Sequence, residues 1–213
     1  MSKPTISDIT IYPVVNRKLF RARWSDLEMI EQLSLGGARI VQLREKELND
    51  YDYFKLATLY RKESLKHNML LIVNDRVDIA LAVKADGVHL GKSDLPLKEA
   101  RRIAGNDFII GGSARSLNDA LRLESEGASY INIGPIFKTK TKPDITPIGL
   151  TVLREAISTI TVPLTAMGGI NLKNIDQLLD VGMKHVGVIE AIFAADDIKV
   201  ATRNLVEKIE SRL

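Results

Sequence analysis

Cysteine is absent from all 213 residues of the chain. Its absence excludes disulfide bonds and every metal site that depends on thiolate ligands. The first residues also lack an apolar run behind their lysine, so we expect no signal peptide and a cytoplasmic location. No stretch reaches the roughly 18–20 apolar residues that a membrane-spanning helix needs, so no membrane association is expected.

The chain also has few aromatic residues and only a small excess of positive charge. Phenylalanine, tyrosine and tryptophan make up 5% of the chain, which supplies little for stacking nucleic-acid bases. The 30 basic residues are interleaved with 27 acidic ones, and the net charge is only +3. We therefore expect no nucleic-acid partner, whereas small anionic ligands are compatible with this composition.

Short β-branched runs alternate regularly with amphipathic segments. Helical patterns are predicted over 50–67 from apolar spacing, over 116–126 from a Ser116/Asp119 capping signature, from Asn171 to Gly182, and over 196–212. The runs that predict strands are 9–15, 38–43, 69–73, 85–90, 108–113, 129–134, 162–167 and 185–189.

Eight strand–helix units favour one closed (β/α)₈ barrel domain over 1–213, although an open doubly wound sheet satisfies the same alternation. The strands are apolar on both faces, as expected for a parallel sheet covered by helices. In such a barrel, ligands bind where strands end and helices begin. The residues directly after each strand are therefore the candidates for function.

The QLREK segment follows the second predicted strand. Gln42, Arg44 and Lys46 occupy alternate positions, so their side chains can point to one side and bind a polyanion. The alternative is a surface ion-pair cluster in which Glu45 and Glu47 neutralise the two cations.

Two carboxylates follow the next two strands. Asp75, preceded by Asn74, and Asp94 could each cap the helix that follows. As a pair they can instead hold Mg²⁺, which prefers a few carboxylates together with waters and phosphate oxygens. His89, on the fourth strand, is expected to be a packed or orienting residue rather than a ligand.

The remaining strand ends are rich in glycine, hydroxyl groups and lysine. After the fifth strand, paired glycines allow close backbone approach beside Ser113, or make a tight turn. After the sixth, GPIFKTKTKPD (134–144) predicts a phosphate site, with a solvated loop as the alternative, and the whole loop 134–147 is expected to be a lid. Gly168 and Gly169 suit the phosphate site usual after strands seven and eight, whereas Glu190 fits only if its carboxylate points away.

Taken in order, these motifs resemble the thiamine-phosphate synthase family. The resemblance covers VQLREK, LIVNDRVDIALAVKADGVHLGKSDLP, GGSARS, GASYINIGPIFKTKTKPD, PIGL and GGI. It implies a (β/α)₈ transferase of thiamine biosynthesis that joins 4-amino-5-hydroxymethyl-2-methylpyrimidine diphosphate to 4-methyl-5-(2-phosphooxyethyl)thiazole and releases pyrophosphate. It further implies a dissociative mechanism, in which the C–O bond of the diphosphate breaks first.

The resemblance also implies which residues hold the metal and the two substrates. Asp75 and Asp94 would bind Mg²⁺, the expected cofactor. The thiazole phosphate would meet Thr139, Thr141, Gly169, Ile189 and Glu190. The pyrimidine diphosphate would be held by Gln42, Arg44, Lys46, Asn74, Ser113 and Lys142, of which Arg44, Lys46, Ser113 and Lys142 are expected to act in catalysis.

Two alternatives stay open. A related thiazole tautomerase is expected to carry a histidine in the position of Pro135, and proline cannot transfer a proton. A catalytically silent regulatory or phosphate-ligand-binding barrel is suggested by Glu190, because the family usually has a serine there. Met167 also replaces a smaller residue, which would tighten the pocket. The oligomeric state cannot be read from the sequence.

Overall fold

The computed structural model describes residues 3–140 and 144–212. Its strands are β1 (Ile11–Pro13), β2 (Ile40–Leu43), β3 (Leu70–Asn74), β4 (Gly87–Leu90), β5 (Ile109–Ala114), β6 (Tyr130–Ile133), β7 (Leu164–Ala166) and β8 (Val186–Val188). Its helices are η1 (Ile6–Asp8), α1 (Arg17–Phe20), α2 (Asp26–Leu35), α3 (Asp50–Lys66), α4 (Val77–Ala82), α5 (Leu97–Ala104), α6 (Leu117–Ser125), α7 (Gly149–Thr159), α8 (Ile175–Leu179), α9 (Glu190–Phe193) and α10 (Ile198–Glu210).

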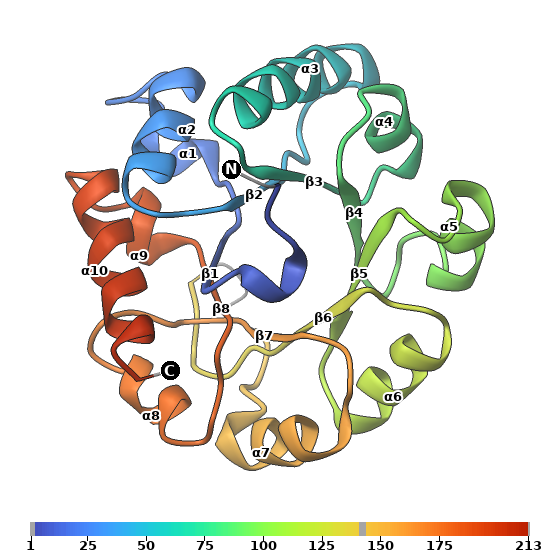
Figure 1. The fold of residues 1–213 in the computed structure, drawn as a ribbon, viewed down its shortest axis with the longest axis vertical. Helices are drawn as coiled ribbons and strands as arrows, with labels where there is room; N and C mark the ends of the chain where they lie inside the picture. The colour runs from blue at the N-terminus through green and yellow to red at the C-terminus, as the bar shows by residue number, and fades with distance from the viewer. Residues whose placement is uncertain (1–2, 141–143, 213) are drawn as a thin grey trace.

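The eight strands pair in parallel in the order β1-β8-β7-β6-β5-β4-β3-β2. A bridge between Val14 and Gln42 joins the two ends of this sheet, and the helices surround the resulting ring (Figure 1). Each predicted apolar run overlaps one of these strands. The barrel prediction is therefore confirmed, and the open doubly wound sheet is excluded.

Apolar side chains pack on both sides of the strands, which explains why the strands lack polar alternation. On β2, Val41 and Leu43 face the helices, whereas Ile40 belongs to a smaller cluster inside the barrel. That interior cluster also contains Tyr12 and Tyr130. The period of two along each strand thus assigns alternate residues to the outer core and to the interior.

The two ends of the barrel differ. Ile6 of η1 and Ile9 join the interior cluster together with Leu70 and Ile109, the first residues of β3 and β5. The 3₁₀ turn η1 thereby closes the N-terminal end, and it lies across the centre of the ring in Figure 1. At the other end Ser113 of β5 is exposed. The C-terminal end is therefore the open one.

The predicted helices form, with one correction at α8. The predicted start at Asn171, where this residue would cap the helix, is too early: the Asn171 side chain accepts a hydrogen bond from the Lys173 amide at 2.9 Å and stabilises a turn. The helix begins only at Ile175, which leaves Leu172 outside it and 44% exposed. The capping signature of α6 is half present: Ser116 accepts from the Asp119 amide at 3.1 Å, whereas the Asp119 carboxylate accepts from the Arg115 amide.

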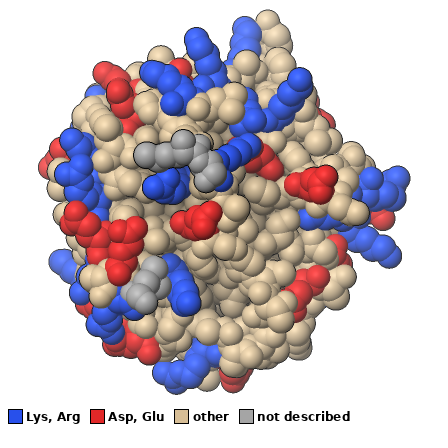
Figure 2. Space-filling model, in the orientation of Figure 1, with Lys and Arg blue, Asp and Glu red and all other residues tan. Residues whose placement is uncertain are grey.

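Charged side chains of both signs are mixed over the face shown in Figure 2, with no large area of one sign. This agrees with the interleaved charges of the sequence. Within the described ranges, no helix combines the length and apolarity that crossing a bilayer requires.

Candidate active site

The three polar residues of QLREK have different surroundings. Gln42 is 2% exposed inside the barrel, and its Nε2 donates to the Tyr12 hydroxyl at 2.9 Å. Lys46 reaches the end of β3, where its Nζ lies 2.9 Å from Asp75 Oδ2. Arg44 is half-buried, and within residues 3–140 and 144–212 no hydrogen bond or ion pair engages its guanidinium. A half-buried, uncommitted guanidinium is well suited to an anionic ligand.

The neighbouring glutamates pair with other cations. Glu45 Oε2 lies 3.7 Å from an Arg17 guanidinium nitrogen, and Glu47 pairs with Lys18. A surface ion-pair cluster therefore exists, but it uses the cations of α1. It does not neutralise Arg44 or Lys46, which favours the ligand-binding interpretation of QLREK.

Asp75 and Asp94 lie side by side at the ends of β3 and β4. Burial, followed by the neighbouring Asp94 carboxylate, raises the pKa of Asp75 above its ordinary value, and Lys46 opposes this rise. In the described part of the chain, no third acidic, histidine or cysteine side chain joins them. Two adjacent carboxylates with the other positions left for water and phosphate are the ligand set that Mg²⁺ prefers. The residues present therefore fit this metal.

The alternative interpretation required Asp75 and Asp94 to cap the helices that follow them, and neither does so. The N-cap of α4 is Arg76 and that of α5 is Pro96, and neither position has a side-chain capping bond. Asp75 instead has a left-handed φ of 66°. Asp94 Oδ2 accepts from the Gly91 amide at 2.6 Å, which fixes its own loop.

A chain of hydrogen bonds connects Gln42 to Ser113 through the barrel interior. After Gln42 it passes from the Tyr12 hydroxyl to the Tyr130 hydroxyl at 2.5 Å. His89 Nδ1 lies 3.1 Å from that hydroxyl, and His89 Nε2 lies 2.8 Å from Ser113 Oγ. His89 is thus 4% exposed with both ring nitrogens in hydrogen-bond contact, which agrees with the packed or orienting residue that the sequence predicts. The two tyrosines were not predicted, although a buried tyrosine hydroxyl on an inward-facing position calls for a partner.

The paired glycines of β5 make room for side chains of this protein. A Cβ atom at Gly111 would lie 2.0 Å from Cζ of Tyr130, and one at Gly112 would lie 2.7 Å from Leu123 Cδ2. The expected close approach is present, but Tyr130 inside the barrel and Leu123 outside it make the contacts. Gly111 therefore allows the Tyr130 hydroxyl to reach His89.

Two further amide side chains line the interior. Asn74, 6% exposed, lies opposite His89 in the register of β3 and β4. Asn132 of β6 is 5% exposed and lies between Ser113 and Thr165 in register. Its Oδ1 is buried and has no hydrogen-bond partner within the described residues. Such an acceptor lowers the stability of the ligand-free protein.

The first part of the 134–147 loop is anchored. The amides of Ile136 and Phe137 donate to the carbonyls of Met167 and Gly168 at 2.8 and 3.1 Å, and the peptide bond before Pro135 is cis. These bonds tie the start of the loop to the end of β7, and the predicted lid stays a prediction. Lys138 and Lys140 are exposed and Thr139 is half-buried, whereas the predicted ligands Thr141 and Lys142 lie outside the described residues.

Glycine is required in the turn after β7. Gly168 and Gly169 have φ of 96° and 69°, and a Cβ at Gly169 would lie 2.4 Å from the Lys138 carbonyl oxygen. Met167 fits its position because Gly187 of β8 lies beneath it; a Cβ there would be 1.6 Å from the Met167 sulfur. The turn and the 134–138 segment thus pack directly on each other.

The end of β8 leads into a short helix, as predicted. Ile189 and Glu190 are half-buried, and Glu190 is the first residue of α9. No salt bridge or side-chain hydrogen bond of the Glu190 carboxylate is found in the described ranges. Gly169, Ile189 and Glu190 therefore lie at the ends of two neighbouring strands, as expected.

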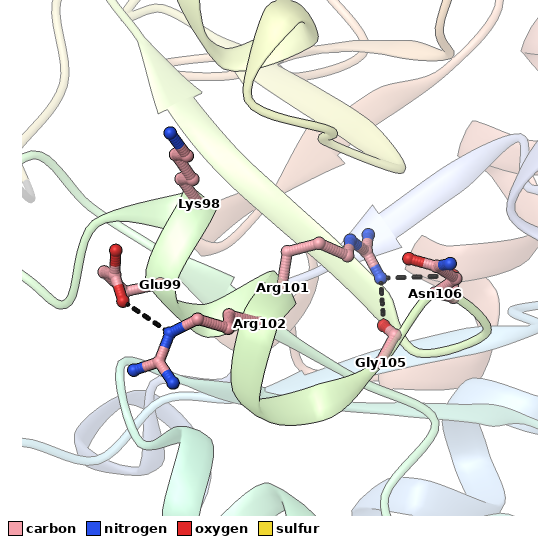
Figure 3. A pocket seen from close by; sticks show the side chains of 6 residues that line it. All are labelled: Lys98, Glu99, Arg101, Arg102, Gly105 and Asn106. Atoms are coloured by element: carbon pink, nitrogen blue, oxygen red, sulfur yellow. Dashed lines mark hydrogen bonds and ion pairs between the residues drawn. The ribbon is translucent and has the colours of Figure 1, made fainter.

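A shallow hollow outside the barrel is drawn in Figure 3. Its polar groups serve the local chain: Arg101 donates to the carbonyls of Gly105 and Asn106 at 2.8 and 3.2 Å, and Arg102 pairs with Glu99 at 2.9 Å. We therefore assign it a structural role.

Comparison with known proteins of similar sequence identifies the family to which this barrel belongs. A family model described as thiamine monophosphate synthase matches residues 11–192. A thiamine-phosphate synthase of Clostridium novyi (strain NT) is 43% identical over 196 residues, covering 92% of this chain and 96% of that protein. The chain belongs to the thiamine-phosphate synthase family.

Further members of the family support the assignment. The thiamine-phosphate synthase of Chloroflexus aurantiacus is 43% identical over 206 residues, covering 96% of this chain and 94% of that protein. The solved thiamine phosphate pyrophosphorylase from Pyrococcus furiosus superposes with a TM-score of 0.88 at 35% identity, covering 96% and 97% of the two chains. A 3-hexulose-6-phosphate synthase, at a TM-score of 0.69 and 16% identity, shares the fold alone. Family membership makes the chain a transferase.

Proposed function

We propose that the protein is a Mg²⁺-dependent synthase that couples the hydroxymethylpyrimidine diphosphate to the thiazole phosphate, giving thiamine phosphate and pyrophosphate. The observation that carries this proposal is the open barrel end. There Arg44 has no hydrogen-bond or ion-pair partner among the described residues, Lys46 contacts Asp75, Asp75 adjoins Asp94, and Ser113 is exposed. These groups together suit a diphosphate and a metal.

The pyrimidine diphosphate binds, on this proposal, against β2 to β5. When its C–O bond breaks, negative charge grows on the leaving pyrophosphate, and preorganised donors stabilise that charge more than they stabilise the substrate. Arg44 and Lys46 supply the positive charge and Ser113 a hydroxyl donor, and Lys142 is proposed to join them. Gln42 and Asn74 position the rest of the substrate.

Mg²⁺, held by Asp75 and Asp94, supplies Lewis-acid neutralisation of the diphosphate when bound. The contact of Lys46 with Asp75 supports this arrangement, because a cation already lies against the carboxylate pair. We propose that Lys46 turns toward the diphosphate oxygens when the complex forms.

The thiazole phosphate binds, on this proposal, at the ends of β6 to β8. The backbone of the Gly169 turn and of Ile189–Glu190 offers amide donors, and Thr139 and Thr141 offer hydroxyl groups. Glu190 is tolerated if only its backbone takes part. No nucleophilic side chain is required, because the dissociative step forms a carbocation that the thiazole nitrogen captures.

The test is an assay of pyrophosphate release with both substrates and Mg²⁺. Release that requires all three supports the synthase. Isomerisation of the thiazole phosphate without pyrophosphate release would indicate the tautomerase, and ligand binding without any turnover would indicate a silent barrel.

A further inference from the structure

The hydrogen-bond chain from Gln42 to Ser113 can be given a direction by counting the donors and acceptors along it. We propose that Tyr12, Tyr130 and His89 are positioning residues that make Ser113 Oγ an acceptor inside the protein and leave its proton for a phosphate oxygen of the ligand. The proposal rests on the proposed function in one respect: the ligand is taken to be the leaving diphosphate.

The direction is set at the Gln42 end. A side-chain amide nitrogen only donates, so the Tyr12 oxygen accepts from Gln42 Nε2. Within the described ranges, the Tyr130 oxygen is the one acceptor found for the Tyr12 proton. The reverse direction would leave the Tyr12 proton buried without an acceptor, which lowers stability.

With this direction, the same count of donors and acceptors places the His89 proton. Tyr130 accepts from Tyr12, so its own proton is donated to His89 Nδ1. An imidazole that accepts at Nδ1 carries its proton at Nε2. Nε2 lies 2.8 Å from Ser113 Oγ and therefore donates to it.

Ser113 is the point at which this chain reaches the open barrel end. Tyr12, Tyr130, Gln42 and His89 are between 1% and 4% exposed, whereas Ser113 is exposed. Because its oxygen already accepts from His89, its own proton is available to an anion. Successive hydrogen bonds also polarise one another, which makes the last hydroxyl a stronger donor.

Packing holds the chain in place. The Tyr12 and Tyr130 ring centroids are 5.5 Å apart, those of His89 and Tyr130 are 5.7 Å apart, and Gly111 leaves space for the Tyr130 ring. Burial raises the pKa of the Tyr12 and Tyr130 hydroxyls, so both keep the protons that the chain requires.

The first test measures the His89 tautomer by nitrogen NMR on the full chain without ligand. The chain has three histidines, so His67→Gln and His185→Gln variants suffice to assign the signals. We expect a protonated Nε2 and an unprotonated Nδ1. A protonated Nδ1, or exchange between both tautomers, would overturn the proposal whether or not the protein is an active synthase.

The second test is a double-mutant cycle in the pyrophosphate assay. Tyr130→Phe should lower kcat on the order of tenfold with little change in KM, because Ser113 can then donate to His89 instead of to the ligand. In a Ser113→Ala background, Tyr130→Phe should cause no further fall. An equal fall in both backgrounds would show that Tyr130 does not act through Ser113.

Tyr60→Phe is the matched control. Tyr60 is also fully buried, but its hydroxyl bonds to Asp26 at 2.7 Å between helices. It should lower the melting temperature and leave kcat and the His89 tautomer unchanged. If Tyr130→Phe does not fold, Tyr12→Phe interrupts the same chain one residue earlier and should lower kcat in the same background-dependent way. An inactive wild-type protein would count against the proposed synthase function, but not against the proposed protonation of His89.

Discussion

The open barrel end has two halves that present different chemistry. The half formed by β2 to β5 presents side chains: Arg44, Lys46, the Asp75–Asp94 pair and Ser113. The half formed by β7 and β8 presents backbone, with Gly169 at a positive φ and packed on Lys138. Charged side chains suit a group whose charge grows during reaction, whereas backbone amides suffice for a phosphate whose charge stays constant.

The largest effect should come from the cations of the side-chain half. Arg44→Ala should lower kcat/KM by about 10²–10³-fold, the loss typical for one donor to developing charge. Folding should be unaffected, because no hydrogen bond or ion pair of this guanidinium is found in the described ranges. Lys142→Ala should likewise lower kcat far more than stability. Steady-state kinetics measures the activity of the two variants and thermal melting measures their stability, with Arg154→Ala at an exposed position as the control. Unchanged kinetics for Arg44→Ala would contradict the proposed difference between the two halves.

The carboxylate pair should respond to metal. At Mg²⁺ about 100-fold above its dissociation constant, binding should stabilise the protein by about 2.7 kcal/mol. Asp75→Asn should abolish this gain, whereas Asp107→Asn, an exposed position on the surface, should keep it. Denaturant unfolding with and without Mg²⁺ measures the difference, and an unchanged gain in Asp75→Asn would place the metal elsewhere.

The backbone half can be probed with two glycines that both have positive φ. Gly105→Ala should cost about 1–3 kcal/mol from backbone strain alone, because its φ of 82° and ψ of 176° suit glycine and its Cβ would meet nothing within 4 Å. Gly169→Ala adds the 2.4 Å contact with the Lys138 carbonyl and should be less stable than Gly105→Ala. It should also raise KM for the thiazole phosphate, while KM for the pyrimidine diphosphate changes little. Equal KM changes for both substrates would contradict a division of labour between the halves.

The smallest effect concerns the boundary between the halves. Asn132→Val removes a buried acceptor that has no partner among the described residues, and it should stabilise the ligand-free protein by about 1 kcal/mol. Thr202→Val should give a comparable gain, because the Thr202 hydroxyl in α10 is also buried without a partner in the part of the chain that the structure describes. Denaturant unfolding measures both. A loss of stability in Asn132→Val would mean that its amide has a role in the free protein.

The sequence predicted the fold because local patterns carry it: β-branched runs mark the strands, and a strand end locates Arg44 and Lys46. The carboxylate pair could be predicted for the same reason, since neighbouring strands end together. The tyrosine chain could not. Tyr12 and Tyr130 are 118 positions apart, and their contact depends on barrel closure and on the space above Gly111. The start of α8 was missed because the Asn171 side chain favours a turn over a cap.

The closure of the N-terminal end by η1 has a consequence for how ligands enter and leave the barrel. With one end sealed by Ile6 and Ile9, the two proposed substrates would arrive, and their products would depart, through the same open end. Whatever is held deepest, near Gln42, has to enter first and leave last. On the proposed function, an inhibitor that occupies the open end would therefore obstruct both substrates together, and accumulated product would slow turnover by occupying the same entrance.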